Sequence, residues 1–301
     1  MNASFAPARE AARAATALQQ HPTAALYVVA TPIGNLADIS LRALHVLDLA
    51  DAVACEDTRH TQGLLKLYGI AKPLLAVHEH NEAEAAQQVV ERLRAGQRVA
   101  YVSDAGTPAV SDPGARLVAA TRAAGLGVVP VPGASSVTAV LSVAGLSEGS
   151  GFVFAGFLPT KASEREQAVA QLARESRAVV LLEAPHRIAA LSQALAALGE
   201  RPLTVGRELT KQFEDIATTT AAGLGAWLAA DAHRSRGEFA LVLHPQALPA
   251  DQELAEAERV LALLLQELPL KGAVRLAAEI SGAPRNALYE RALALKAGAG
   301  E

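Results

Sequence analysis

Short apolar runs alternate with longer amphipathic segments along most of this chain. The runs predict buried strands, and segments of about 10–14 residues with apolar positions at helical spacing predict the helices between them. Before residue 132, strands are expected at Leu26–Ala30, Ala52–Cys55, Leu74–Val77, Val99–Val102 and Gly127–Val131. Strands that alternate with helices predict an α/β fold with a largely parallel sheet.

The second half of the chain repeats this pattern and then changes. Residues around Gly145–Gly151 turn to Gly and Ser, which predicts a domain boundary. Further strands are expected at Phe152–Ala155, Ala178–Leu182, Leu203–Val205 and Glu238–Leu243. From Asp251 the pattern is purely helical, with breaks expected at Gly272 and Gly282. We expect a flexible N-terminal extension (1–23), two α/β domains (24–147 and 148–246) and a helical tail (251–301).

Composition narrows the class of protein. Of the 301 residues, 51% are hydrophobic and 19% charged, so a sizeable core is expected and global disorder is not. A net charge of -4 argues against a protein that coats free nucleic acid, although it leaves room for a local basic patch. The single cysteine, Cys55, excludes an internal disulfide and a cysteine-based zinc site. This low cysteine content fits a reducing cytoplasm, which is the location we expect. No apolar run approaches the roughly 18 residues of a membrane helix, so no membrane partner is expected.

Three loops rich in Gly and Pro follow strands of the first series. They are Ala30–Asn35, Asp104–Gly114 and Val131–Ser136. Loops at the carboxyl ends of parallel strands share one sheet edge, where open α/β folds bind ligands. No GxxxxGK[ST] motif and no dinucleotide fingerprint is present, so the loops suit a compact ligand without a pyrophosphate. Asp112-Pro113-Gly114 further predicts the start of a helix that runs to Ala124, with Asp112 as its N-cap.

Six motifs occur in order from Leu26 to His244: ATPIGNL, CEDTRHT, SDAGTPAVSDPG, VPGASS, EAPHR and GRELTK. In these motifs the chain resembles the tetrapyrrole-methylase superfamily and, within it, the ribosomal RNA small subunit methyltransferase I group. The resemblance implies two α/β domains with S-adenosylmethionine in the cleft between them, and a homodimer. It also implies methylation of the ribose 2′-hydroxyl of a cytidine in the decoding region of 16S ribosomal RNA, within an assembled 30S subunit.

The resemblance assigns cofactor contacts residue by residue. Ala105-Gly106-Thr107-Pro108 stands where the superfamily commonly has Gly-Gly-Asp-Pro, so Thr107 replaces an acid. Matching loop positions after the other strands add contacts from both domains. The implied cofactor residues are Pro32, Ala105, Gly106, Thr107, Val110, Ser135, Ser136 and Ala184.

Two polar clusters follow the second and third strands. The first holds Glu56, Asp57, Arg59 and His60, and the second is the run from His78 to Glu82. A metal site is one interpretation, but consecutive side chains diverge and we expect no metal. A catalytic and RNA-binding surface is favoured, in which Glu56, Asp57 or His60 is the general base and Arg59 holds a phosphate. Helix caps and ion pairs are the remaining interpretation.

Further cations leave the function partly open. Arg187 and Lys211 are reasonable RNA-backbone contacts, and Lys271, Arg275, Arg285 and Arg291 lie on the helical tail. That tail suits either a nucleic-acid-binding helix pair or a packing or dimer element. Two other functions stay open: methylation of a tetrapyrrole or another small molecule, and a non-catalytic ribosome-assembly factor.

Overall fold

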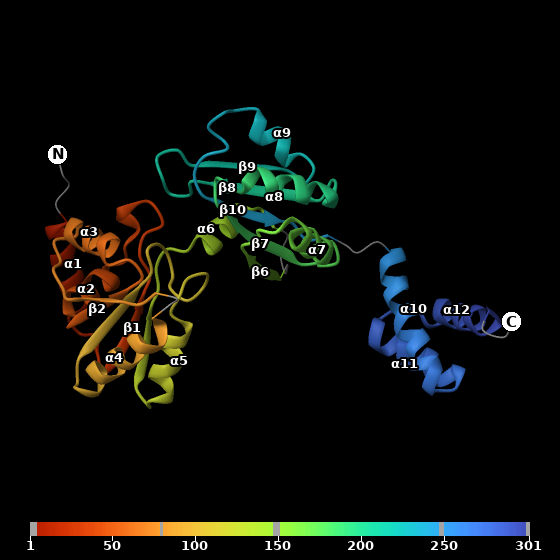
Figure 1. The fold of residues 1–301 in the computed structure, drawn as a ribbon, viewed down its shortest axis with the longest axis horizontal. Helices are drawn as coiled ribbons and strands as arrows, with labels where there is room; N and C mark the ends of the chain where they lie inside the picture. Colours follow the sequence, from red (N-terminus) through yellow and green to blue (C-terminus); the bar gives the residue numbers. More distant parts are fainter. Residues whose placement is uncertain (1–4, 79–80, 147–150, 247–249, 299–301) are drawn as a thin grey trace.

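The computed structural model describes residues 5–78, 81–146, 151–246 and 250–298. It has two α/β domains and a group of C-terminal helices set apart from them (Figure 1). The first domain contains α1 (Ala6–Thr16), β1 (Ala25–Val29), the 3-10 turn η1 (Leu36–Asp38), α2 (Leu41–Leu49), β2 (Ala52–Cys55), α3 (Thr58–Leu67), β3 (Leu74–Ala76), α4 (Glu82–Arg94), β4 (Arg98–Val102), α5 (Ala115–Ala123) and β5 (Gly127–Val131).

The first sheet has the strand order β3-β2-β4-β1-β5, and all its pairs are parallel. Leu26 on the central strand β1 lies opposite Val99 on β4 and Val128 on β5. Helices α1, α2 and α3 cover one face, and α4 and α5 cover the other. Both faces are therefore apolar, which explains why the strands read as continuous apolar runs. The expected parallel α/β sheet is confirmed.

The N-terminal segment differs from the expected flexible extension, because residues 6–16 form helix α1. Ala12 is fully buried in the core beneath this helix. Arg9 and Arg13 both pair with Asp48 on α2, with nitrogen–oxygen distances of 2.7 and 2.6 Å. The partner carboxylate lies far along the chain, so an Ala-rich sequence alone carries no signal for this packing.

The second domain contains β6 (Phe152–Gly156), α7 (Ala162–Leu172), β7 (Ala178–Glu183), α8 (Ile188–Leu195), the 3-10 turn η2 (Ala196–Leu198), β8 (Pro202–Arg207), β9 (Asp215–Thr220), α9 (Leu224–Ala229) and β10 (Phe239–Leu243). Its strand order is β6-β7-β10-β8-β9. Only β6 and β7 pair in parallel, and the other pairs are antiparallel. Strand β9 was not expected from the sequence, because this half-exposed edge strand is mostly polar.

Helix α6 (Ser136–Val143) connects the two domains. Its Val137 and Val140 are buried against Val242 of β10 and Ala178 of β7. By packing, α6 therefore belongs with the second sheet, whereas the sequence placed it in the first domain. The expected boundary itself falls partly on residues 147–150, which lie outside the described residues.

The C-terminal helices are α10 (Ala250–Glu267), α11 (Leu270–Ser281) and α12 (Arg285–Gly298). They share a separate core that includes Leu261, Val274 and Leu288. The break expected at Gly282 is confirmed, because this residue ends α11 with φ +74°. The break expected at Gly272 is wrong: it lies in the first turn of α11, which begins after Pro269. Among the residues described, no helix is long and apolar enough to cross a membrane.

Candidate active site

The three Gly/Pro loops meet at the carboxyl edge of the first sheet, since β4, β1 and β5 are neighbours. Thr31 and Gly106 exchange two backbone hydrogen bonds, of 2.9 and 3.1 Å. The Thr107 hydroxyl donates to the Ala134 carbonyl at 3.1 Å. Thr107, which stands where the superfamily commonly has an acid, therefore joins the second loop to the third.

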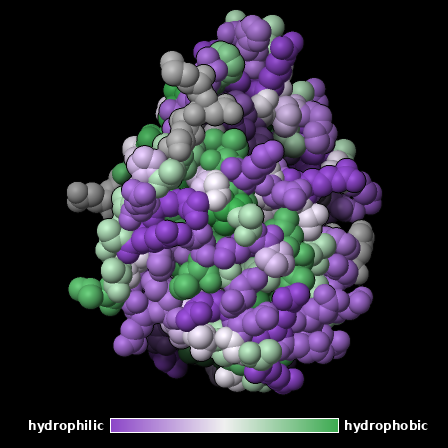
Figure 2. All heavy atoms as spheres, turned by 90° about the vertical axis from the view of Figure 1, so that its left-hand side faces the viewer, coloured by the Kyte–Doolittle hydropathy of each residue, from purple (hydrophilic) through white to green (hydrophobic). Residues whose placement is uncertain are grey.

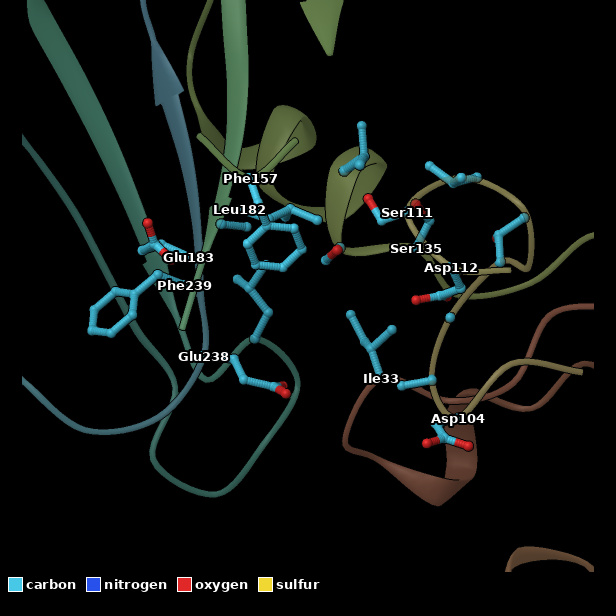
Figure 3. A pocket seen from close by; sticks show the side chains of 18 of the residues that line it. Ile33, Asp104, Ser111, Asp112, Ser135, Phe157, Leu182, Glu183, Glu238 and Phe239 are labelled. Atoms are coloured by element: carbon cyan, nitrogen blue, oxygen red, sulfur yellow. The ribbon is translucent and has the colours of Figure 1, made fainter. Parts of the chain in front are cut away.

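A pocket of about 340 Å³ lies between the two domains at this edge (Figure 3). The side chains of Asp104, Ser111 and Asp112 approach it from the first domain, and Glu238 and Phe157 approach it from the second. Among the residues expected to act here, the lining includes Glu56, Ala105, Gly106, Thr107, Val110, Ser135, Ser136 and Ala184. The pocket thus gathers nearly all of the expected cofactor residues and one of the expected catalytic ones.

Four expected residues lie outside this lining: Pro32, Asp57, Arg59 and His60. Pro32 is buried, and its neighbour Ile33 lines the pocket instead. Asp57 is the N-cap of α3, where its Oδ1 accepts hydrogen bonds from the backbone N–H groups of Arg59 (2.7 Å) and His60 (3.2 Å). The bonds from His60 and Arg59 lower the pKa of Asp57. Its geometry is that of a helix cap.

Three carboxylates crowd the first-domain side of the pocket: Glu56, Asp104 and Asp112. Burial raises the pKa of Glu56, and the negative charges of Asp104 and Asp112 raise it further. Burial also raises the pKa of Asp112, although a hydrogen bond with Ser103 opposes the shift. This side of the pocket therefore favours a cationic ligand and a carboxylate that holds a proton more readily than usual.

Asp112 does not cap the following helix, so the sequence-based assignment of that helix start is wrong. Helix α5 begins at Ala115, after Gly114 with φ +123°. Its cap comes from α4, because Glu82 Oε1 accepts hydrogen bonds from the backbone N–H groups of Gly114 (3.1 Å) and Arg116 (3.0 Å). Because Glu82, which is distant in sequence, caps α5, Asp112 does not cap this helix and lines the pocket instead.

Lys211 crosses from the second domain to the first at the rim of the pocket. Its side chain lies against Gly34, where any Cβ would clash with it. The Lys211 ammonium pairs with Glu208 (2.8 Å) and Glu238 (2.9 Å). Glu208 has φ +51°, a left-handed backbone conformation that is unusual for a residue other than glycine. Lys211, expected to contact RNA, is instead engaged with two carboxylates.

Other expected charged sites have structural partners as well. Arg187 pairs with the buried Glu183 at 3.1 Å. In the second polar cluster, Asn81 Oδ1 accepts a hydrogen bond from the His78 N–H, and Glu82 caps α5. Glu79 and His80 of that cluster lie outside the described residues. Within the described ranges, no group of three or more His, Cys, Asp or Glu side chains could hold a metal ion.

Comparison with known proteins agrees with this architecture. Residues 25–225 match the Tetrapyrrole (Corrin/Porphyrin) Methylases. The chain belongs to this family. Residues 251–296, which form α10 to α12, match the RsmI C-terminal HTH domain.

Relatives in sequence cover most of this tetrapyrrole methylase, and solved structures share its fold. It is 50% identical over 273 residues to the ribosomal RNA small subunit methyltransferase I of Neisseria meningitidis serogroup B, covering 90% of this chain and 94% of that protein. The Escherichia coli O157:H7 protein of the same name is 45% identical, with 92% and 99% covered. Diphthine synthase aligns with a TM-score of 0.58 at 17% identity, covering 75% and 91% of the two chains. A Thermus thermophilus uroporphyrin-III C-methyl transferase complexed with S-adenyl homocysteine aligns at 0.50 and 19%, covering 72% and 96%.

Proposed function

We propose that the chain transfers a methyl group from S-adenosylmethionine to the ribose 2′-hydroxyl of a cytidine in the decoding region of 16S ribosomal RNA. The observation that carries this proposal is the pocket between the domains, in which loop backbone faces a group of carboxylates. The names of relatives up to 50% identical support methyl transfer to small-subunit ribosomal RNA. The likeness to a methyltransferase complexed with S-adenyl homocysteine supports the cofactor.

The residues of the pocket fit this cofactor. S-Adenosylmethionine carries a sulfonium and an ammonium, and carboxylates at Glu56, Asp104 and Asp112 favour positive charge. Around Gly106 the loop presents backbone rather than bulky side chains. A volume of about 340 Å³ lies within the usual range for small-molecule sites. We infer that the loops hold the cofactor and that Ala184 contacts it from the second domain.

When bound, S-adenosylmethionine supplies a methyl carbon whose bond to the sulfonium sulfur breaks, with both electrons passing to sulfur, as the ribose oxygen attacks in line. The protein must align that oxygen and accept its proton. Of the acids and the histidine expected as base candidates, Glu56 alone lines the pocket. Its raised pKa makes the ionised form a stronger base. We therefore assign proton removal to Glu56 and the positioning of α3 to Asp57.

We further propose three properties that the resemblance implies. The substrate is ribosomal RNA within an assembled 30S subunit, the enzyme is a homodimer, and it acts in the cytoplasm. Light scattering of the purified protein tests the dimer directly, since a monomeric mass at working concentration would contradict it.

A methyl-transfer assay tests the proposed function and its alternatives together. Radiolabelled S-adenosylmethionine is offered with assembled small subunits, naked 16S RNA and a porphyrin precursor. We expect label on the RNA, recovered after nuclease digestion as 2′-O-methylcytidine. Label on the porphyrin precursor alone would establish the small-molecule alternative, and no label on any substrate would favour an assembly factor.

Two variants test the assignment of the base. Glu56→Gln keeps the shape of the side chain but removes its basicity, so turnover should fall by about 10²-fold or more. Asp57→Asn is the matched control, because Asn is also a good helix cap. We expect Asp57→Asn to retain near-normal turnover and melting temperature. Equal losses in both variants would contradict this division of roles.

A further inference from the structure

A second cavity opens on the first domain, along α3 and the segment that leads into β3. Its volume is about 640 Å³, and its lining includes Arg59, Gln62, Lys66 and Lys72. All three charged residues in the lining are cations. We refer to these four residues as the α3 groove. The charge of the α3 groove is therefore opposite to that of the pocket between the domains, where carboxylates dominate.

Three side chains of the groove form a stripe on one helix face. Arg59, Gln62 and Lys66 occupy positions i, i+3 and i+7 of α3, which fall on the same side of an α-helix. At 1.5 Å per residue, Arg59 and Lys66 are separated by about 10 Å along the axis. The stripe can therefore contact an extended strand at more than one point.

These side chains are available for a partner. Arg59, Gln62 and Lys66 are all exposed, and within the described part of the chain their side chains make no hydrogen bond or ion pair. Arg59 acts on Asp57 only through its charge and its backbone N–H. Cations elsewhere, such as Arg9 and Lys211, are paired with carboxylates. Lys72 is anchored, because its ammonium donates to the Asp48 carbonyl at 2.6 Å.

The position of the groove relates it to the pocket. Helix α3 begins at Thr58, two residues after Glu56, so Arg59 stands at the end of the groove nearest the pocket. A protein with a net charge of -4 and an acidic pocket repels a polyanion as a whole. An RNA strand therefore needs a local cationic surface outside the pocket to bring its ribose close to Glu56. Hydrophilic residues predominate on the outer face of the first domain (Figure 2), consistent with a solvated surface.

We propose that the α3 groove binds the phosphate backbone of the RNA strand next to the target nucleotide. Arg59 and Lys66 would each neutralise a phosphate, Gln62 would donate a hydrogen bond between them, and Lys72 would form the fixed wall. The proposal rests on the proposed function, because that function supplies RNA as the polyanion.

The test measures RNA binding as a function of salt, separately from catalysis. Arg59→Ala, Lys66→Ala and the double variant are compared with wild type, using fluorescently labelled RNA from the small subunit. The plot of log K against log salt has a negative slope, and each lost phosphate contact should reduce its magnitude by about 0.7. The double variant should therefore lose about 1.4 in slope and bind several-fold more weakly at low salt. Affinity for S-adenosylhomocysteine should not change.

Controls separate a specific groove from general charge. Arg122→Ala on α5 removes an exposed arginine of the same domain that lies outside the groove lining, and it should preserve the slope. Lys66→Arg keeps the charge and should restore wild-type binding. In methyl transfer, Lys66→Ala should raise the KM for subunits and leave kcat unchanged.

The outcomes distinguish the two proposals. A double variant with wild-type slope and affinity would overturn the proposed role of the α3 groove. It would favour α10–α12 as the RNA-binding element. Wild-type protein that binds RNA through the groove but transfers no methyl group to it would overturn the proposed function alone. Wild-type protein that binds neither the labelled RNA nor assembled small subunits would overturn both.

Discussion

Replacement of Gly106 by valine should weaken the binding of the cofactor. Gly106 has φ +80°, a left-handed conformation that a β-branched residue avoids. Its N–H and C=O both bond to Thr31, so the loop cannot rotate without losing that bridge. A Cβ at this position would lie 3.2 Å from Ile33 Cγ2, another lining atom. Valine therefore strains the loop and also crowds the pocket.

The expected magnitude follows from these two effects. A left-handed conformation costs an L-residue about 1–2 kcal/mol, and overpacking costs about 1–3 kcal/mol. If the loop moves to relieve the strain, cofactor binding must restore it, so affinity should fall by about 5- to 150-fold. Titration calorimetry with S-adenosylhomocysteine on the folded variant measures this loss.

Gly125→Val is the matched control for Gly106→Val. Gly125 has φ +72° and follows α5, and a Cβ added there would meet no other atom within 4 Å. Gly125→Val should lose a similar amount of stability through backbone strain and should lose no cofactor affinity. Unchanged cofactor affinity in Gly106→Val would refute the assignment of this loop to cofactor binding. Equal losses of cofactor affinity in Gly106→Val and Gly125→Val would show that the effect does not arise at the pocket.

Three further predictions concern the structure around the site. Glu82→Ala leaves two amides at the start of α5 without their acceptor, so denaturant unfolding should show a loss of about 2–4 kcal/mol, against a smaller loss for Glu82→Gln. Burial favours a higher pKa for Asp48, but Arg13 and Arg9 outweigh it and lower the pKa. The stability from α1 docking should thus be full above about pH 4 and lost below it, as limited proteolysis would report, with Asp48→Asn insensitive to pH. Dialysis against a strong chelator should leave methyl transfer intact, and rescue by one divalent ion would contradict this unless the ion acts on the RNA.

Much of the fold could be predicted because strands buried on both faces leave a local signature. The strands of the first sheet are apolar runs, and their loops carry Gly and Pro where backbone approaches backbone. Strand β9 has no such signature, since an exposed edge needs few apolar residues. Helix α1 has none because its docking depends on Asp48, whose contact is formed only in the folded chain.

The site was harder to predict for the same physical reason. In the sequence, Asp112-Pro113 is typical of a helix start. Asp57 follows a strand directly, which is typical of a catalytic acid. In the structure Asp57 caps a helix and Asp112 faces the pocket. For Asp112, local sequence cannot exclude the role of helix cap, because the residue that caps α5 is Glu82, which lies on another helix. Asp57 could have been recognised by its spacing, since the N–H groups that it caps lie only two and three residues ahead.

The cap of α3 links the two charged surfaces that methyl transfer to RNA requires. A cationic cofactor favours carboxylates in the pocket, and the same carboxylates repel the phosphates of the RNA. The two charges must therefore be separated and yet lie close enough to share one nucleotide. By fixing the start of α3, Asp57 sets Glu56 in the pocket and Arg59 in the α3 groove, although only two residues lie between them. A substitution at residue 57 that uncaps the helix should thus weaken both surfaces together, whereas Glu56→Gln and Arg59→Ala should each affect one.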